Sequence, residues 1–108
     1  MRKRQTTSDA LAILEKRYFT ERATERRALA QAEFNARIAQ KIYALRIQAG
    51  LTQQQLAKFV GTTGTVISRL EDADYDGHSL KMLQRISAAL GRRLEIRFVP
   101  TRTRRRSA

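Results

Sequence analysis

The spacing of apolar residues in the middle of the chain predicts two short helices. Between Leu51 and Glu71, the apolar residues at helical spacing are Leu56, Ala57 and Val60, followed by Ile67 and Leu70. Gly61 separates the two groups, at a point where a helix can end in a left-handed residue that only glycine adopts without strain. We therefore expect a pair of helices joined by a tight turn in Leu51–Glu71.

Polar residues at the expected helix starts support this arrangement. Thr52 is a good N-cap for the first helix, and Gln55 can reach back to it as a capping box. Thr63 can cap the second helix in the same way. With the apolar residues turned inward, the residues on the first turn and outer face of the second helix are Gly64, Thr65, Val66, Ser68 and Arg69.

The residue types on that outer face suit DNA recognition. The N-terminal end of a recognition helix enters the major groove, where arginine can bind guanine O6 and N7 through two hydrogen bonds. Threonine and serine can donate or accept hydrogen bonds there, and valine can contact a thymine methyl. The pattern alone leaves two interpretations equally open: a helix-turn-helix, or an ordinary helical hairpin with a solvated face.

The N-terminal half of the chain predicts a long helical region. Ser8–Ala49 contains neither proline nor glycine, so one long helix or two helices are both allowed. The residues that form an apolar, core-facing stripe there are Phe34, Ile38, Ile42, Leu45 and Ala49. We expect Phe34–Ala49 to be the first helix of the folded domain and Asp9–Glu33 to form a helical arm outside it.

After the central helix pair, the pattern predicts one more helix. Ser79 can cap a helix over Leu80–Leu90, and Gly91 can end it. The residues expected to point inward from this helix are Leu80, Leu83, Ile86 and Leu90.

A change of period to two then predicts a single strand. Leu94, Ile96 and Phe98 share one face, and Pro100 stops the strand. A lone strand cannot satisfy its own backbone groups, and no other segment of the chain has a strand pattern. We therefore predict that the strands of two copies pair antiparallel about a two-fold axis, with these three apolar residues at the interface of a homodimer.

The charge balance favours a polyanionic partner. The chain of 108 residues carries 22 Lys and Arg against 10 Asp and Glu, a net charge of +12. It has no cysteine, no apolar run long enough to span a membrane and no signal-peptide pattern, so we expect a cytoplasmic protein without membrane contact. Together with the helix pair, the charge favours double-stranded DNA as the partner.

The sequence offers no arrangement suited to catalysis or metal binding. The acidic run Asp72–Gly77 resembles the start of an EF-hand calcium loop, but Leu83 occupies the position that must supply a bidentate glutamate. We interpret the run as a turn. His78 is the only histidine, and a cysteine nucleophile is absent. We predict that the protein is not an enzyme and has no catalytic residue, no metal site and no cofactor.

The run Arg46–Glu71, RIQAGLTQQQLAKFVGTTGTVISRLE, resembles the helix-turn-helix of the lambda-repressor-like, Xre family. The resemblance implies that Gln53 meets a phosphate at a helix N-terminus and that Arg46 and Glu71 occupy positions that pair with each other, which leaves an ion pair or a phosphate contact equally open for Arg46. It also implies base reading from the second helix, although Gly64 stands where such repressors often carry a glutamine. The predicted DNA-binding residues are Thr52, Gln53, Thr63, Gly64, Thr65, Val66, Ser68 and Arg69.

The following segment, Asp72–Pro100, is similar to HigA-type antitoxins and related small Xre regulators. In that group the antitoxin neutralises a RelE-fold ribonuclease and, as a dimer, represses its own operon. The resemblance implies such a repressor, with the arm as a candidate toxin-binding segment. The charge of Met1–Gly50, 11 basic and 5 acidic residues, argues against this role because RelE-fold toxins are generally basic. A stand-alone Xre regulator or a protein-interaction module remains an alternative.

The predicted fold is mainly α: a lambda-repressor-like helix-turn-helix bundle with an N-terminal helical arm and one C-terminal β-strand that pairs across a dimer. We divide the chain into a basic segment with the arm (residues 1–33), a DNA-binding domain (residues 34–91), a dimerisation strand (residues 92–100) and a basic tail (residues 101–108). The tail carries Arg102, Arg104, Arg105 and Arg106 and is expected to be disordered.

Overall fold

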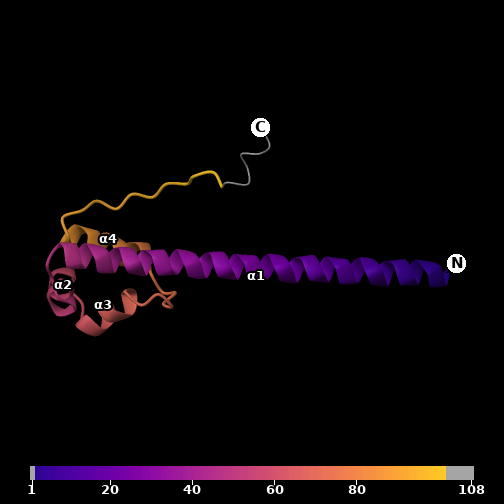
Figure 1. The fold of residues 1–108 in the computed structure, drawn as a ribbon, viewed down its shortest axis with the longest axis horizontal. Helices are drawn as coiled ribbons and strands as arrows, with labels where there is room; N and C mark the ends of the chain where they lie inside the picture. Colours follow the sequence, from indigo (N-terminus) through magenta and orange to yellow (C-terminus); the bar gives the residue numbers. More distant parts are fainter. Residues whose placement is uncertain (1, 102–108) are drawn as a thin grey trace.

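The computed structural model describes residues 2–101 and contains four helices: α1 (Arg2–Gln48), α2 (Gln53–Val60), α3 (Gly64–Leu70) and α4 (Leu80–Ala89). The described residues form no strand, so the chain is mainly α, as predicted. Figure 1 shows α2, α3 and α4 gathered around the C-terminal end of α1. Of the predicted tail, only Thr101 lies within the described residues.

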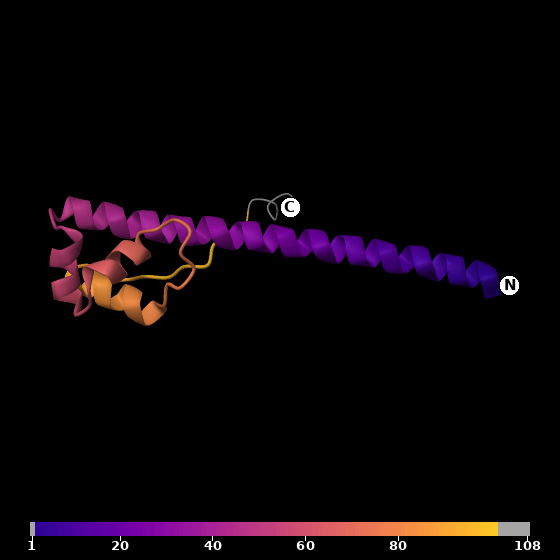
Figure 2. The same cartoon turned by 90° about the horizontal axis from the view of Figure 1, so that it is seen from below.

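The N-terminal half of the chain forms one helix rather than two. α1 runs without a break, and its N-terminal part projects away from the other helices (Figures 1 and 2). Thr24 lies inside this helix, and its hydroxyl donates to the carbonyl of Thr20 one turn earlier, at 2.9 Å. The longest dimension of the molecule is 73 Å, which matches a helix of 47 residues at about 1.5 Å per residue.

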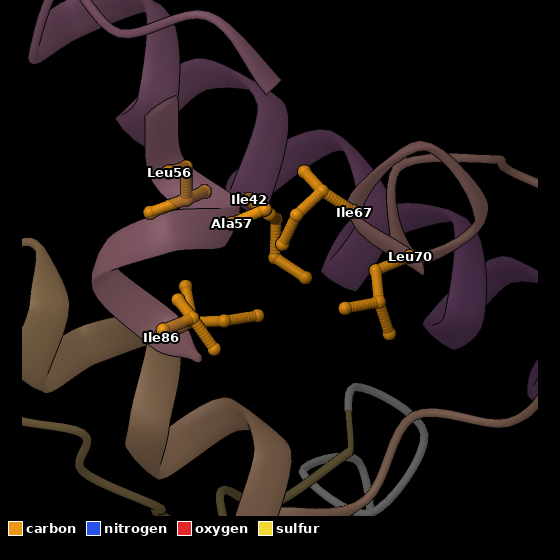
Figure 3. Close-up of a cluster of buried hydrophobic side chains, with 7 residues drawn as sticks. Ile42, Leu56, Ala57, Ile67, Leu70 and Ile86 are labelled. Carbon is orange, nitrogen blue, oxygen red and sulfur yellow. The ribbon is translucent and has the colours of Figure 1, made fainter. Parts of the chain in front are cut away.

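The hydrophobic core is small and lies where the four helices meet (Figure 3). The buried residues that form it are Ile42, Leu56, Ala57, Val60, Ile67, Leu70 and Ile86. Leu56 and Ile67 are the largest side chains that are fully buried. The inward positions predicted for α2 and α3 are confirmed, since all of them belong to this cluster.

The apolar stripe predicted for the C-terminal part of α1 is wrong at its ends. Phe34 is 51% exposed, and Ala49, just after the helix, is also exposed. The residues that α1 buries are Asn35, Ala39, Ile42 and Arg46. An apolar pattern misses this face because two of its members are polar and have partners inside the protein. Asn35 accepts a hydrogen bond from Gln31 Nε2 at 3.0 Å, and the partners of Arg46 are described below.

The helices α2, α3 and α4 begin at the predicted N-caps, and α2 ends at the predicted Gly61, whereas α1 begins at Arg2, before the predicted Asp9, and α4 ends at Ala89, one residue before the predicted Leu90. The Thr52 hydroxyl accepts from the amide of Gln55 at 3.0 Å, and the Thr52 amide donates to Gln55 Oε1 at 2.9 Å, which forms the capping box. Gly61 follows α2 with a φ of 86°, in the left-handed region. Thr63 caps α3 and Ser79 caps α4, each through a hydrogen bond from an amide in the first turn.

The loop between α3 and α4 is fastened by its aromatic residues. His78 Nε2 donates to the carbonyl of Leu70 at 2.8 Å, and its ring meets that of Tyr75 edge-on at 5.1 Å between centroids. Leu80, predicted to point inward, is instead 56% exposed. The reason is its place in the first turn of α4, since the helix reaches the core through Ile86 in its second half.

The strand predicted over Leu94–Val99 is not formed in the single chain. This segment has no regular secondary structure and runs back in the direction of the N-terminal end of α1 (Figure 1). Leu94 is half-buried, whereas Ile96 and Phe98 are 58% and 97% exposed. A strand needs a backbone partner, and no described residue of the same chain forms a strand beside it. Pairing with a second copy therefore stays a prediction.

Candidate nucleic-acid interface

The turn between α2 and α3 is closed from two sides. The amides of Gly61 and Thr62 both donate to the carbonyl of Ala57, at 2.8 and 2.9 Å. From α4, Arg85 Nη2 donates to the carbonyls of Val60 at 2.9 Å and Gly61 at 3.1 Å. These contacts fix the angle at which α3 leaves α2. Sequence reasoning missed Arg85 because its partners lie 24 and 25 positions away and no local pattern connects them.

The outward side of α3 presents the residues best placed to reach DNA. Thr65, Ser68 and Arg69 are all exposed. Because Ser68 and Arg69 follow Thr65 by three and four positions, the three side chains lie on neighbouring parts of one helix face. This face therefore offers two hydroxyl groups and one guanidinium group to a ligand.

Two of the residues predicted to read bases lie differently. Val66 is half-buried and packs against the hydrophobic core. Gly64 is half-buried as well, and a Cβ atom built on it would lie 3.1 Å from Gln54 Cγ. A larger residue at this position requires Gln54 to move, so the glycine allows α3 to approach α2 closely. Neither Val66 nor Gly64 extends a long side chain outward.

A hollow separates the N-terminal ends of α2 and α3. The residues that line it are Gln53, Gln54, Thr63, Gly64, Thr65 and Ser68. Gln54 is not among the predicted DNA-binding residues. Its position next to Gln53 in the first turn of α2 could have indicated that it lies at the same site. The hollow thus brings together most of the predicted DNA-binding residues from both helices.

A buried ion pair joins the end of α1 to the end of α3. Arg46 Nε and Nη2 donate to the two carboxylate oxygens of Glu71 at 2.6 and 2.9 Å, and Arg46 Nη1 donates to the carbonyl of Leu51 at 2.8 Å. The two side chains are 9% and 4% exposed. Hydrogen bonding to Glu71 raises the pKa of Arg46 above its ordinary value, against a smaller opposing effect of burial. The arginine therefore stays charged at every pH near neutrality.

The comparison with protein families decides what this arrangement is. The family model described as helix-turn-helix matches residues 42–96, which is more than half of the chain. The chain belongs to the helix-turn-helix family. The predicted resemblance to lambda-repressor-like, Xre proteins is thereby confirmed. A comparison with curated proteins found no match.

The helix-turn-helix match begins at Ile42, inside α1, and ends at Ile96, beyond α4. It therefore includes the last turns of α1 and leaves the projecting part of that helix outside. A helix-turn-helix domain implies DNA binding, and the matched family is one of DNA-binding regulators rather than of enzymes. In the described part of the chain, no helix is long and apolar enough to cross a membrane.

Within the helix-turn-helix, Gln53 takes part in the network around the buried ion pair. Its Nε2 donates to Glu71 Oε1 at 3.1 Å. A glutamine amide has two N–H groups, so one remains for a second acceptor. Thr52 and Thr63 use their hydroxyl oxygens as caps of α2 and α3. These three predicted DNA-binding residues thus also hold the two helices in place.

The charge of the helix-turn-helix suits an anionic ligand. Lys58 and Arg69 are the charged residues between Thr52 and Leu70, and no Asp or Glu occurs in that stretch. Glu71, which follows directly, is neutralised by Arg46. A phosphate backbone that approaches α2 and α3 therefore meets no uncompensated negative charge from these helices.

Proposed function

We propose that this chain is a sequence-specific DNA-binding transcriptional repressor. The observation that carries the proposal is the outward side of α3, where Thr65, Ser68 and Arg69 are exposed on one face of a helix held by fixed contacts. Hydroxyl and guanidinium groups match the acceptors and donors on base edges in the major groove. A repressor of this kind acts by occupying its operator.

The proposed contacts divide between bases and phosphates. Arg69 is the residue suited to a bidentate contact with guanine, and Thr65 and Ser68 provide single hydrogen bonds. Gln53 and Gln54 lie in the first turn of α2, where backbone N–H groups and the helix dipole favour a phosphate. Specificity then comes mainly from α3, and the register on the duplex from α2.

Replacing Arg69 by alanine is expected to cost about 1–3 kcal/mol on the preferred duplex and to relax the preference at one base pair. The loss follows from the removal of two hydrogen bonds to one base. The preferred duplex is first selected from a random pool, and affinity is then measured on selected and scrambled duplexes at one salt concentration. Lys81→Ala, which removes an exposed positive charge from α4, is the matched control and should not change the ratio of the two affinities. An Arg69→Ala protein that keeps the wild-type ratio would exclude base reading by Arg69.

We also propose that the segment Leu94–Val99 pairs with that of a second copy as an antiparallel strand. Its support is the alternating pattern together with the exposure of Ile96 and Phe98, whose apolar side chains are 58% and 97% exposed in the single chain. A two-fold dimer presents two recognition helices to two half-sites, which increases affinity for a symmetric operator.

Ile96→Pro is expected to abolish association through this segment, because proline lacks the N–H group that a strand pair requires. Glu95→Ala, which alters an exposed side chain, should leave the association unchanged. Neither variant should change the helical content, since residues 94–99 lie outside the four helices. Sedimentation equilibrium at micromolar concentration measures the effect. Equal association constants for Ile96→Pro and the wild type would rule out the strand pair.

A second candidate function is that of a HigA-type antitoxin. It is favoured by the resemblance of Asp72–Pro100 and by the helical arm, which exposes apolar side chains that a toxin can cover. If this is correct, the neighbouring gene encodes a small RelE-fold protein, and the two proteins co-purify after joint expression. A neighbouring gene of another class, or separate elution of the two proteins, would leave a stand-alone regulator.

A further inference from the structure

Among residues 2–101, nothing covers the projecting part of α1. From Asp9 to Phe34 every residue is exposed except Ala23, which is half-buried. Large apolar side chains on this stretch are 51–67% exposed: Leu11, Ile13, Leu14, Tyr18, Phe19, Leu29 and Phe34. Helices without tertiary contacts are marginally stable in water, so a long helix with exposed apolar residues calls for a partner.

Several of these residues form one line along the helix. Steps of three and four positions connect the members of this line, which we name the arm stripe: Leu11, Leu14, Tyr18, Arg22, Glu25, Leu29, Ala32 and Ala36. Its N-terminal part is bulky, with two leucines and a tyrosine. Its C-terminal part is mostly small, with two alanines. Two opposite charges, Arg22 and Glu25, lie at its middle.

The two central charges have no ion-pair partner among the described residues, where the ion pairs are Arg46–Glu71 and Arg93–Glu95. The Arg22 guanidinium instead lies over the ring of Tyr18, at 5.6 Å from the ring centre, and donates to its hydroxyl at 2.9 Å. This contact keeps the positive charge on the arm stripe.

The arm stripe is complementary to itself when the helix direction is reversed. If Arg22 of one copy faces Glu25 of another, the same register sets Tyr18 opposite Leu29 and Leu11 opposite Ala36. Leu11 then faces a small residue, Tyr18 faces another apolar side chain, and each central charge faces its opposite. A parallel pair in register would instead set Arg22 against Arg22 and Glu25 against Glu25 at the interface, which is unfavourable.

The charge of the arm also permits self-association. Residues 9–33 contain equal numbers of acidic and basic residues: Asp9, Glu15, Glu21, Glu25 and Glu33 against Lys16, Arg17, Arg22, Arg26 and Arg27. The net positive charge of the chain therefore lies outside this stretch. Two copies of the arm can therefore approach each other without the electrostatic repulsion expected from the net charge of the whole chain.

An acidic loop lies beside the position that a second arm would take. A hollow between α1 and the loop that follows α3 is lined by Ala28, Ala32 and Ala36 on one side and by Asp74 and Asp76 on the other. A two-fold axis brings the same flank of both helices to the same side of the pair. Arg17 precedes Asn35 by 18 residues, or five helical turns, so both residues lie on the same side of α1. In the proposed register, Arg17 of one copy lies opposite residue 30 of the other copy. A second copy therefore brings a positive charge to this loop.

From these observations we propose that the projecting part of α1 pairs antiparallel with that of a second copy through the arm stripe. Reciprocal contacts between Arg22 and Glu25 flank the two-fold axis. Tyr18 of each copy packs on Leu29 of the other, and Leu11 packs on Ala36. This interface is separate from the C-terminal segment and does not depend on the strand pair.

Charge reversal tests the register, in the Ile96→Pro background so that only the arm can associate. Arg22→Glu and Glu25→Arg should each raise the dissociation constant in sedimentation equilibrium by about tenfold or more, and the double exchange should restore it. Arg27→Glu makes the same charge change on the opposite face and should have little effect. Circular dichroism verifies that the variants keep their helical content. Unchanged association in both single reversals would overturn the proposal, as would a monomeric Ile96→Pro parent, whose arm would then be free for a different protein.

Cross-linking tests the direction, because the chain has no cysteine of its own. A Tyr18→Cys chain mixed with a Leu29→Cys chain should form a mixed disulfide under mild oxidation. Neither chain alone should cross-link to itself to a comparable extent. Efficient cross-linking of the Tyr18→Cys chain with itself would indicate a parallel pair and contradict the proposed arrangement.

Discussion

Glu71→Ala is expected to lower the free energy of unfolding by about 3–5 kcal/mol, because it leaves Arg46 charged and buried without its partner. The loss extends beyond one contact. Glu71 accepts two hydrogen bonds from Arg46 and one from Gln53, so all three donors lose their acceptor together. The raised pKa of Arg46 shows that this arginine depends on the carboxylate for its charge stabilisation.

Urea denaturation of the variants measures this effect. Arg93→Ala is the matched control, since the Arg93–Glu95 pair has the same 2.6 Å separation but side chains that are 84% and 61% exposed. The exposed pair should contribute little. Joint replacement of Arg46 and Glu71 by methionine should be much less harmful than Glu71→Ala, because it leaves no buried charge. Similar losses for Glu71→Ala and Arg93→Ala would mean that burial does not matter here.

Leu56→Ala is expected to cost about 2–5 kcal/mol of the free energy of unfolding, through lost apolar burial and the cavity left behind. Leu56 is fully buried at the centre of a small cluster that joins all four helices (Figure 3). A core of this size has few other contacts to offset such a loss. The same change should therefore remove much of the stability of the domain.

Phe59→Ala provides the control for this prediction within the same helix. Phe59 is 66% exposed, so its truncation removes a larger side chain but little buried surface. Thermal and urea denaturation of both variants should separate them clearly, with only Leu56→Ala strongly destabilised. A Phe59→Ala protein that loses as much as Leu56→Ala would show that Phe59 is covered in solution by a second copy or another partner.

The features that the sequence predicts well are those that depend on near neighbours. The capping box of Thr52 and Gln55, the left-handed Gly61 and the N-cap Thr63 all act within one helical turn. Their chemistry is the same in most contexts, so both ends of α2 and the start of α3 follow from local rules. The inward faces of these helices follow from periodicity for the same reason.

The features that the hydrophobic pattern does not predict depend on polar partners, although the family resemblance implied one of these pairs, Arg46 with Glu71. Asn35 and Arg46 are buried in α1 because Gln31 and Glu71 satisfy their polar groups, whereas Phe34 is left outside. A hydrophobicity pattern ranks these residues in the opposite order. Leu94–Val99 illustrates a related limit: an alternating pattern marks a possible strand, but a strand forms only where a backbone partner is present.

The candidate site shows the same division. The exposed side of α3, with Thr65, Ser68 and Arg69, follows from helix geometry. The inward turn of Val66 and the contact between Gly64 and Gln54 depend on how closely α3 approaches α2. That distance is set by packing and by the hydrogen bonds from Arg85 of α4 to the turn. The residue pattern of a single helix does not predict such contacts.

The unbroken helix α1 contains two parts that differ in local stability. From Asn35 to Arg46 its residues are anchored by the core, and their amide hydrogens are expected to exchange with solvent only when the whole domain opens. From Asp9 to Phe34 none of the described residues buries the helix, so it can fray turn by turn from its N-terminal end without disturbing the domain. If the arm pairs as proposed, its ordering is linked to assembly. At low protein concentration the arm is then expected to unwind while the helix-turn-helix stays folded, and binding of a second copy supplies the free energy that restores the helix.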